Sequence, residues 1–329
     1  MRSRSGDAAP AETVHCHGAM PRHSALGVFS AALIVAASVA AQPPAAPGGE
    51  LAGVAWHELR YKAHKWLLGA STTTRLEFLP VGSVTLREAP GHDGVQPGGP
   101  LVGRLSTTTD LPFGRAEEAA TWFDPATGAA LQYEKHLTGR KPAHRAGRFT
   151  ASGLYVWRAD PAERDEADRP AETWTKRRDG HSSPQPPVPP GGRLVDSYAL
   201  LYLVSAARLE PGSELRLLTV SRERLIELRL AARRPTERSV AFDELRGGSV
   251  RRRAGPITVV PVEVSARPAG GAQVGSDVDL AFMGLRGTLT VFVEPGTSVP
   301  VAIVGRAEKV GEVTVRLERV TLTEDGPAR

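Results

Sequence analysis

Segments in which apolar and polar residues alternate recur along most of this chain, and they constrain its fold more than any other feature. The clearest is 311–321, where Val313, Val315 and Leu317 alternate with polar residues. Successive side chains of a β-strand point to opposite faces, so this period of two predicts strands with one face in water. The same reasoning predicts strands at 54–62, 72–79, 83–88, 101–107, 119–123, 130–137, 147–151, 154–158, 214–220, 225–230, 239–245, 257–266, 280–283, 287–293 and 299–305.

Glycine and proline separate these segments. The chain holds 34 Gly and 27 Pro, which predicts many turns. Between two predicted strands, Pro125 presets φ and Gly128 permits a positive φ, so this stretch indicates a hairpin. Two stretches rich in Pro, Gly or charge, 89–100 and 159–193, are predicted to be mobile loops.

One segment, 196–209, has the pattern of an amphipathic helix. Asp196 is suited to cap its first turn. Tyr198, Leu201 and Tyr202 fall on one face, and a Pro-Gly pair follows the segment. Many strands and one helix predict a mainly antiparallel all-β fold, in which a curved sheet, open barrel or β-roll packs against the helix. A single domain is predicted over 54–322.

The apolar run at 25–42 follows a basic flank and ends in small residues, which is typical of a secretory signal peptide. It predicts cleavage near residue 41, with Met20 as a plausible start, a flexible spacer at 42–53 and a tail at 323–329. An uncleaved anchor is the alternative. The expected location is the periplasm of a Gram-negative type bacterium, or the medium, with no membrane span after cleavage. Cys16, the single cysteine, would be removed, leaving no disulfide.

Two stretches of this chain resemble a known family. The helical segment 195–212, VDSYALLYLVSAARLEPG, and the ending 289–320 are similar to those of exported bacterial proteins called domain of unknown function 3108, DUF3108. The chain departs from that pattern in its insertions near 89 and 181 and in the late position of Arg208. The resemblance implies a curved or barrel-like antiparallel sheet in the periplasm, and it brings no established catalytic residues.

No catalytic or metal-binding motif is evident. His136 and His144 can meet across a turn, but a zinc site needs three or four ligands. Paired acids can serve glycoside hydrolysis when they face each other across a cleft. There is no nucleophile elbow and no phosphate-binding glycine loop. The sequence therefore predicts no catalytic residue, metal or cofactor. The neighbouring acids are Asp243 with Glu244 and Asp277 with Asp279.

The formal net charge is +5, from 41 basic and 36 acidic residues that are interspersed along the strands. This distribution argues against a nucleic-acid-binding surface. The one basic cluster consists of Arg246, Arg251, Arg252 and Arg253. It is a candidate contact for an anionic partner such as a lipid head group, lipopolysaccharide or an acidic glycan. Alternatively, it is a solvated hairpin tip whose like charges block edge pairing.

Aromatic residues are the remaining candidates for a binding site. On a curved sheet they can line an apolar or sugar-binding groove, although core packing explains them equally well. We expect a non-enzymatic exported protein that binds an apolar or amphipathic envelope ligand in a concave sheet. The alternatives are a carbohydrate-active enzyme or glycan-binding protein, and a structural partner in envelope assembly. The candidate residues are Trp56, Tyr61, Trp122, Tyr133, Trp157, Tyr198 and Tyr202.

Overall fold

A computed structural model places most of the predicted domain. Several predictions lie outside its described residues: the signal peptide, most of the spacer, Cys16, and the acidic residues Asp277 and Asp279. The described residues are 51–65, 68–111, 114–139, 141–221, 223–271, 280–308 and 310–324.

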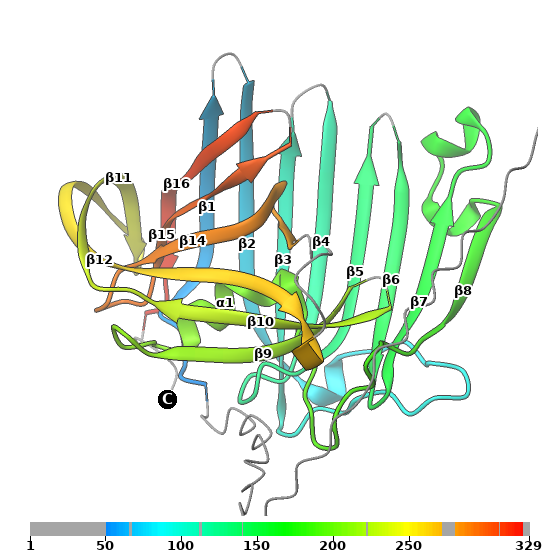
Figure 1. The fold of residues 1–329 in the computed structure, drawn as a ribbon. Helices are drawn as coiled ribbons and strands as arrows, with labels where there is room; N and C mark the ends of the chain where they lie inside the picture. Colours follow the sequence, from blue (N-terminus) through cyan, green and yellow to red (C-terminus); the bar gives the residue numbers. More distant parts are fainter. Residues whose placement is uncertain are drawn as a thin grey trace, which may run out of the picture. The chain divides into compact units, whose positions relative to one another are not determined.

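The described chain forms a 16-stranded sheet whose first eight strands pair with their neighbours in sequence (Figure 1). All of these neighbours are antiparallel. Three short 3-10 helices lie in the connections, η1 (Val81–Ser83), η2 (Arg164–Asp168) and η3 (Ala171–Thr173). The strands are β1 (Trp56–Lys65), β2 (Leu68–Pro80), β3 (Leu101–Leu111), β4 (Arg115–Phe123), β5 (Ala130–Thr138), β6 (Ala143–Thr150), β7 (Gly153–Asp160) and β8 (Lys176–Ser182).

The second half of the chain continues the same sheet from β1. Strand β1 pairs with the last strand, and the order then runs β16, β15, β14, β12, β10 and β9. Strand β11 pairs with β12 and also, in parallel, with β16, which closes a ring of strands through β14 and β15. The elements are β9 (Glu214–Ser221), β10 (Arg224–Ala232), β11 (Thr236–Arg246), β12 (Ser249–Pro268), η5 (Ala269–Gly271), β13 (Ala281–Phe282), β14 (Leu285–Val293), β15 (Pro300–Ala307) and β16 (Gly311–Leu322).

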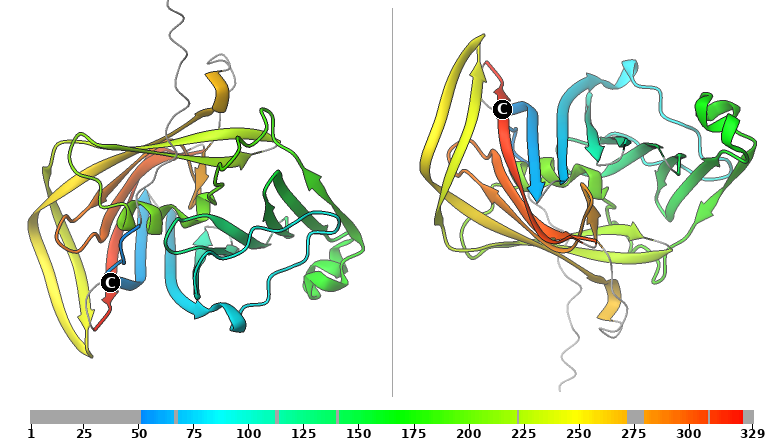
Figure 2. Two further views of the ribbon diagram at one scale, coloured as in Figure 1. Left: turned by 90° about the horizontal axis from the view of Figure 1, so that it is seen from below. Right: turned by 90° about the horizontal axis from the view of Figure 1, so that it is seen from above.

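The sheet curls so that β9 and β10 pass over the inner face of the first strands (Figures 1 and 2). Strands β8 and β9 are its two edges. Near these edges, isolated parallel bridges join Gln185 to Arg224 and Leu194 to Leu218. The predicted fold class is confirmed: the described chain is a mainly antiparallel, curled all-β structure with one packed helix.

The helix lies inside the curled sheet, as a 3-10 turn η4 (Ser197–Ala199) followed by α1 (Leu200–Ala206). The predicted cap is confirmed, because Asp196 Oδ1 accepts a hydrogen bond from the Tyr198 amide at 3.2 Å. Every α1 residue is buried, and all but Ser205 belong to the main hydrophobic core. The helix is shorter than predicted, since Arg208 adopts a left-handed φ of 42°. No helix among the described residues has the length and apolar character needed to cross a bilayer.

Two local predictions differ from the structure. The strand predicted at 83–88 is wrong, because side chains satisfy its backbone instead of a neighbouring strand. The Arg87 amide donates to Gln132 Oε1 at 2.7 Å, and the Arg87 carbonyl accepts from Arg148 Nε at 3.1 Å. Strand β8 lies inside the segment 159–193, for which a loop was predicted. Its sequence, KRRDGHS, has no apolar face to show a period of two.

Candidate functional site

A cavity of about 810 Å³ opens on the inner side of the sheet, between β5–β8, the entry to α1, and β9. This volume is within the range of ligand-binding pockets, about 300–1,000 Å³. The strands present alternate side chains to the cavity, and the chain entering α1 contributes Asp196 and Tyr198. The cavity is therefore built from residues far apart in the sequence.

Four basic residues form a row along one wall of the cavity. Lys135 on β5 lies directly opposite Arg145 on β6, Arg145 lies opposite Arg158 on β7, and Arg158 lies opposite Arg178 on β8. All four line the cavity. Like charges directly opposite each other on neighbouring strands destabilise a sheet, so this arrangement needs compensation by anions. We call these four residues the basic row.

Within the described residues, carboxylates form ion pairs with only two members of the basic row, Lys135 and Arg145. Lys135 Nζ lies 2.7 Å from Glu117 Oε1, and Arg145 Nη2 lies 2.6 Å from Asp160 Oδ1. Arg158 and Arg178 are exposed, and neither forms an ion pair with any residue that the structure describes. Two guanidinium groups with free donors therefore face the cavity side by side, as in sites for carboxylate or phosphate groups.

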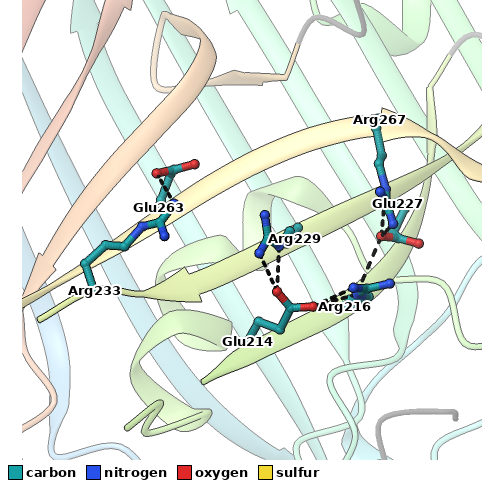
Figure 3. A network of polar contacts seen from close by, with 7 residues as sticks. All are labelled: Glu214, Arg216, Glu227, Arg229, Arg233, Glu263 and Arg267. Carbon is teal, nitrogen blue, oxygen red and sulfur yellow. Dashed lines mark hydrogen bonds and ion pairs between the residues drawn. The ribbon is translucent and has the colours of Figure 1, made fainter. Parts of the chain in front are cut away.

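On the outer face of β9, β10 and β12, arginines that lie opposite each other are neutralised by carboxylates (Figure 3). There Arg216 and Arg229 are directly opposite each other, and Glu214 binds both, at 2.6 and 2.5 Å. On β12, Arg267 binds Glu227 at 2.6 Å. A directly opposed arginine pair in this fold can thus be neutralised by a neighbouring carboxylate. Among the described residues, no carboxylate forms such an ion pair with Arg158 or Arg178, and the nearby Asp179 accepts a hydrogen bond from the Tyr155 hydroxyl instead.

The cavity also has an apolar wall. Phe149, Leu154, Val156 and Val220 line it, next to the basic row. Phe149 and Leu154 belong to a second hydrophobic cluster, against which Val156 and Val220 pack. The cavity is therefore amphipathic, with cations on one side and aliphatic and aromatic groups on the other.

A hydrogen-bonded group closes the inner end of the basic row. Lys135 Nζ donates to the Tyr198 hydroxyl at 2.5 Å, and that hydroxyl donates to Glu117 Oε1 at 3.1 Å. Burial and the nearby Glu117 carboxylate raise the pKa of Tyr198 far above its usual range. Burial also raises the pKa of Tyr133 to about 12. Both phenols are therefore neutral hydrogen-bonding groups near pH 7, and Lys135 is held in place.

Asp196, on the cavity wall, has a strongly perturbed pKa. It is 7% exposed, and burial raises its pKa to about 6, against the opposing effects of the Tyr198 amide, the Thr121 hydroxyl and the Lys135 charge. Its Oδ2 atom is buried with no hydrogen-bond partner by geometry. Because this oxygen is closed to solvent and Oδ1 caps the helix, we assign Asp196 to positioning the helix and not to proton transfer.

Tyr133 forms part of the wall through a close approach to glycine. Gly147 lies directly opposite it on β6. A Cβ atom at Gly147 would lie 2.2 Å from Tyr133 Cε1, so any side chain there would displace the ring. The ring therefore lies over the bare backbone of Gly147.

The seven aromatic candidates are distributed over three environments. Tyr133 and Tyr198 line the cavity. Trp56, Tyr61 and Tyr202 are core residues, each 1% exposed. Their polar atoms bond inside the protein, to Ser205 Oγ, the Pro300 carbonyl and the Pro125 carbonyl respectively. The remaining two lie beside arginines away from the cavity, Trp122 near Arg104 and Trp157 near Arg87.

The arginine cluster lies at the tip of the β11–β12 hairpin. Arg252 Nη1 binds Asp243 Oδ1 at 2.8 Å. Arg253 binds Glu244 at 3.0 Å and Glu294 at 2.7 Å, and its side chain is only 20% exposed. Arg246 and Arg251 are exposed. The structure therefore divides the candidate cluster into two paired residues and two residues that face solvent.

The His136–His144 and Asp243–Glu244 pairs both lie in the described part of the chain. His136 and His144 lie directly opposite, with ring centroids 6.2 Å apart, and His144 Nε2 lies 2.8 Å from Glu134 Oε1. Asp243 and Glu244 are consecutive in β11, so they point to opposite faces. Among the described residues, no group of three His, Cys, Asp or Glu side chains is placed to hold a metal ion.

Comparisons with known proteins add little. Neither the family models nor the curated proteins include a match. Among solved structures, the chain is similar to a beta-barrel-like protein of domain of unknown function DUF1849 from Brucella abortus. The two are 11% identical, the match covers 82% of this chain and 99% of the other, and the TM-score is 0.41. The resemblance to DUF3108 stays a prediction.

Sequence reasoning missed the basic row, although one signal was available. Thr150 pairs with Gly153, so only two residues form the β6–β7 turn. A two-residue hairpin fixes the register, and it places Arg145 opposite Arg158. The pairing of Arg158 with Arg178 could not be predicted from the sequence in this way, because β8 has no hydrophobic pattern and follows a long connection.

Proposed function

We propose that this protein is an exported, periplasmic, non-enzymatic binding protein whose cavity takes a single-chain anionic amphiphile. The basic row beside an apolar wall is the observation that carries the proposal. Arg158 and Arg178 offer free guanidinium donors to a carboxylate or phosphate head group. The ligand's hydrocarbon chain then lies against Phe149, Leu154 and Val156.

The two interactions reinforce each other. An anionic head relieves the repulsion between opposed arginines, so binding removes a cost that the empty protein carries. Each methylene group withdrawn from water adds about 0.8 kcal/mol. Selectivity follows from the charge, because a neutral or cationic head leaves Arg158 and Arg178 without a partner.

A neutral glycan is supported less well. Glycan sites present aromatic rings, but only two of the seven aromatic candidates, Tyr133 and Tyr198, reach this cavity. Glycoside hydrolysis needs two accessible carboxyl groups. Of the three acids in the described lining, Asp196 caps a helix and has a buried Oδ2 atom, and Asp179 accepts a hydrogen bond from the Tyr155 hydroxyl. This leaves Glu223 without a facing acid in such a role. An amphiphile therefore accounts for more of the cavity than a sugar does.

The test is to measure the binding of decyl phosphate by titration calorimetry, at concentrations below those at which it forms micelles. Decyl maltoside and decyltrimethylammonium have the same chain with a neutral and a cationic head. We expect decyl phosphate to bind at least about tenfold more tightly than either, because charge-assisted hydrogen bonds contribute about 1.5–3 kcal/mol. Arg158→Gln with Arg178→Gln should remove this preference.

The matched control is Arg216→Gln with Arg229→Gln, which changes an opposed arginine pair on the outer face. This variant should bind decyl phosphate as the unmodified protein does. Equal affinity for all three ligands, or equal loss in both double variants, would contradict the proposal. Tighter binding of the maltoside would instead favour a glycan site. Amino-terminal sequencing of protein recovered from the periplasm tests export.

A further inference from the structure

The tip of the β11–β12 hairpin exposes one apolar side chain close to two arginines in sequence. Arg246 pairs with Ser249, so Gly247 and Gly248 form a two-residue turn, with φ of 53° and 78°. Positive φ at both positions is the geometry of a tight hairpin turn. Val250 follows at 64% exposed, the highest value among the large apolar residues that the structure shows as exposed.

The tip carries positive charge that nearby acids do not neutralise. Arg251 lies directly opposite Glu244, but Glu244 binds Arg253 instead, at 3.0 Å. Asp243 is likewise taken by Arg252, at 2.8 Å. Arg246 and Arg251 are exposed and form no ion pair with any residue in the described part of the chain. Alternation along the strand turns Arg246 and Arg251 to one face of the hairpin and Val250 to the other, so all three meet a surface that the tip approaches end-on.

Protection of the sheet edge explains only part of this arrangement. Charged residues on an exposed edge discourage pairing with other chains, which accounts for the arginines. It does not account for Val250, because an exposed apolar side chain on an edge favours association. Arginines beside an apolar tip suit the surface of an anionic bilayer, where guanidinium groups bind lipid phosphates and the apolar group enters the acyl boundary.

We propose that this hairpin tip docks the protein onto an anionic membrane surface, through Arg246, Val250 and Arg251. The inference goes beyond ligand binding in the cavity and does not depend on it. The contact is small, so it is reversible and sensitive to salt, with each arginine contributing through charge.

Flotation of the full chain with vesicles tests this. The vesicles contain phosphatidylethanolamine with about one third phosphatidylglycerol, and phosphatidylcholine vesicles serve as the neutral reference. Near an anionic surface a basic residue contributes about 1 kcal/mol, which is about fivefold in binding. Arg246→Gln with Arg251→Gln should therefore weaken binding to the anionic vesicles about 25-fold. Val250→Ser should weaken it about threefold.

The controls separate this surface from the cavity. Arg229→Gln with Arg267→Gln removes the same charge from another face and should bind the vesicles several-fold more tightly than the tip variant does. Arg158→Gln with Arg178→Gln alters only the cavity and should retain vesicle binding. Equal binding to both vesicle types, or an unchanged affinity of the tip variant, would refute membrane docking. Loss only in the cavity variant would show that lipid capture, and not the hairpin, attaches the protein.

Discussion

The outer face of β9, β10 and β12 and the inner face of β5–β8 both place arginines directly opposite each other. On the outer face Glu214 bridges Arg216 and Arg229 (Figure 3). On the inner face Arg158 and Arg178 have no carboxylate partner in the described chain. The difference shows that this fold can neutralise such a pair and does not do so in the cavity. This pair, without a carboxylate partner among the described residues, is the basis of the proposed anionic ligand.

The carboxyl groups of the two regions differ as well. Hydrogen bonds from Arg216 and Arg229 lower the pKa of Glu214, whereas burial raises the pKa of Asp196 to about 6. The outer carboxylate is stabilised in its charged form, and the inner one is destabilised in that form. Stability should therefore depend on pH with opposite signs in the two regions.

The largest effect is expected at Asp196. Its pKa is raised in the folded state, so its contribution to stability is present below pH 4 and lost as the pH rises through 6. From the ordinary value of 3.8 to about 6, the loss amounts to about 3 kcal/mol. Asp196→Asn keeps a capping side chain without the charge. Urea denaturation should show it more stable than the unmodified protein at pH 7.5, with the difference vanishing near pH 4.

Glu214→Gln supplies the contrast for that measurement. Because the folded-state pKa of Glu214 is lowered, its contribution is present above the ordinary value of 4.5 and lost as the pH falls. This variant should lose stability near neutral pH and match the unmodified protein in acid. If both variants shift in the same direction with pH, the contrast between the two regions is wrong.

Charge reversal in the basic row should have the next largest effect. Arg158→Glu with Arg178→Glu should lower the affinity for decyl phosphate at least about 100-fold, because two charge-assisted contacts become repulsive. The same variant should gain affinity for decyltrimethylammonium. Titration calorimetry with each ligand measures this reversal of preference. A variant that loses both ligands would indicate collapse of the cavity, which near-ultraviolet circular dichroism would reveal.

The smallest effect is expected on the stability of the protein without ligand. Arg158→Gln with Arg178→Gln removes an opposed pair of like charges, so the free energy of unfolding should rise by about 0.5–1 kcal/mol. Arg229→Gln removes an exposed ion pair and should lower it by about 0.2–1 kcal/mol. Denaturation in low salt measures both changes. A decrease for the cavity variant would mean that these arginines already have a partner.

Local pattern was sufficient for most strands and for the helix cap. The alternation at 311–321 predicted β16 within one residue, and Asp196 caps the helix as expected. The pattern failed at 83–88, where Gln132 and Arg148 replace a neighbouring strand. Both partners are remote in sequence, so no local signal distinguishes this segment from a strand. Strand β8 is a strand that the pattern did not predict, because backbone pairing with β7 stabilises it although it has no apolar face.

The candidate site was less accessible from the sequence. Aromatic residues were expected to mark the groove, yet Trp56, Tyr61 and Tyr202 are core residues. Composition alone does not separate a buried ring from an exposed one, because both environments favour aromatics. Position relative to the curl of the sheet decides which rings face the cavity, and only Tyr133 and Tyr198 do.

The sequence by itself determined the all-β class, the strand spacing and the capped helix, because alternation and capping act between residues close in the chain. Only the tertiary structure decided which charged residues lie next to each other. Lys135, Arg145, Arg158 and Arg178 are spread over 44 positions of the sequence, and strand register brings them into one row. A shift of one residue in register turns a side chain to the other face, so small differences in pairing decide whether these charges line a cavity or face solvent.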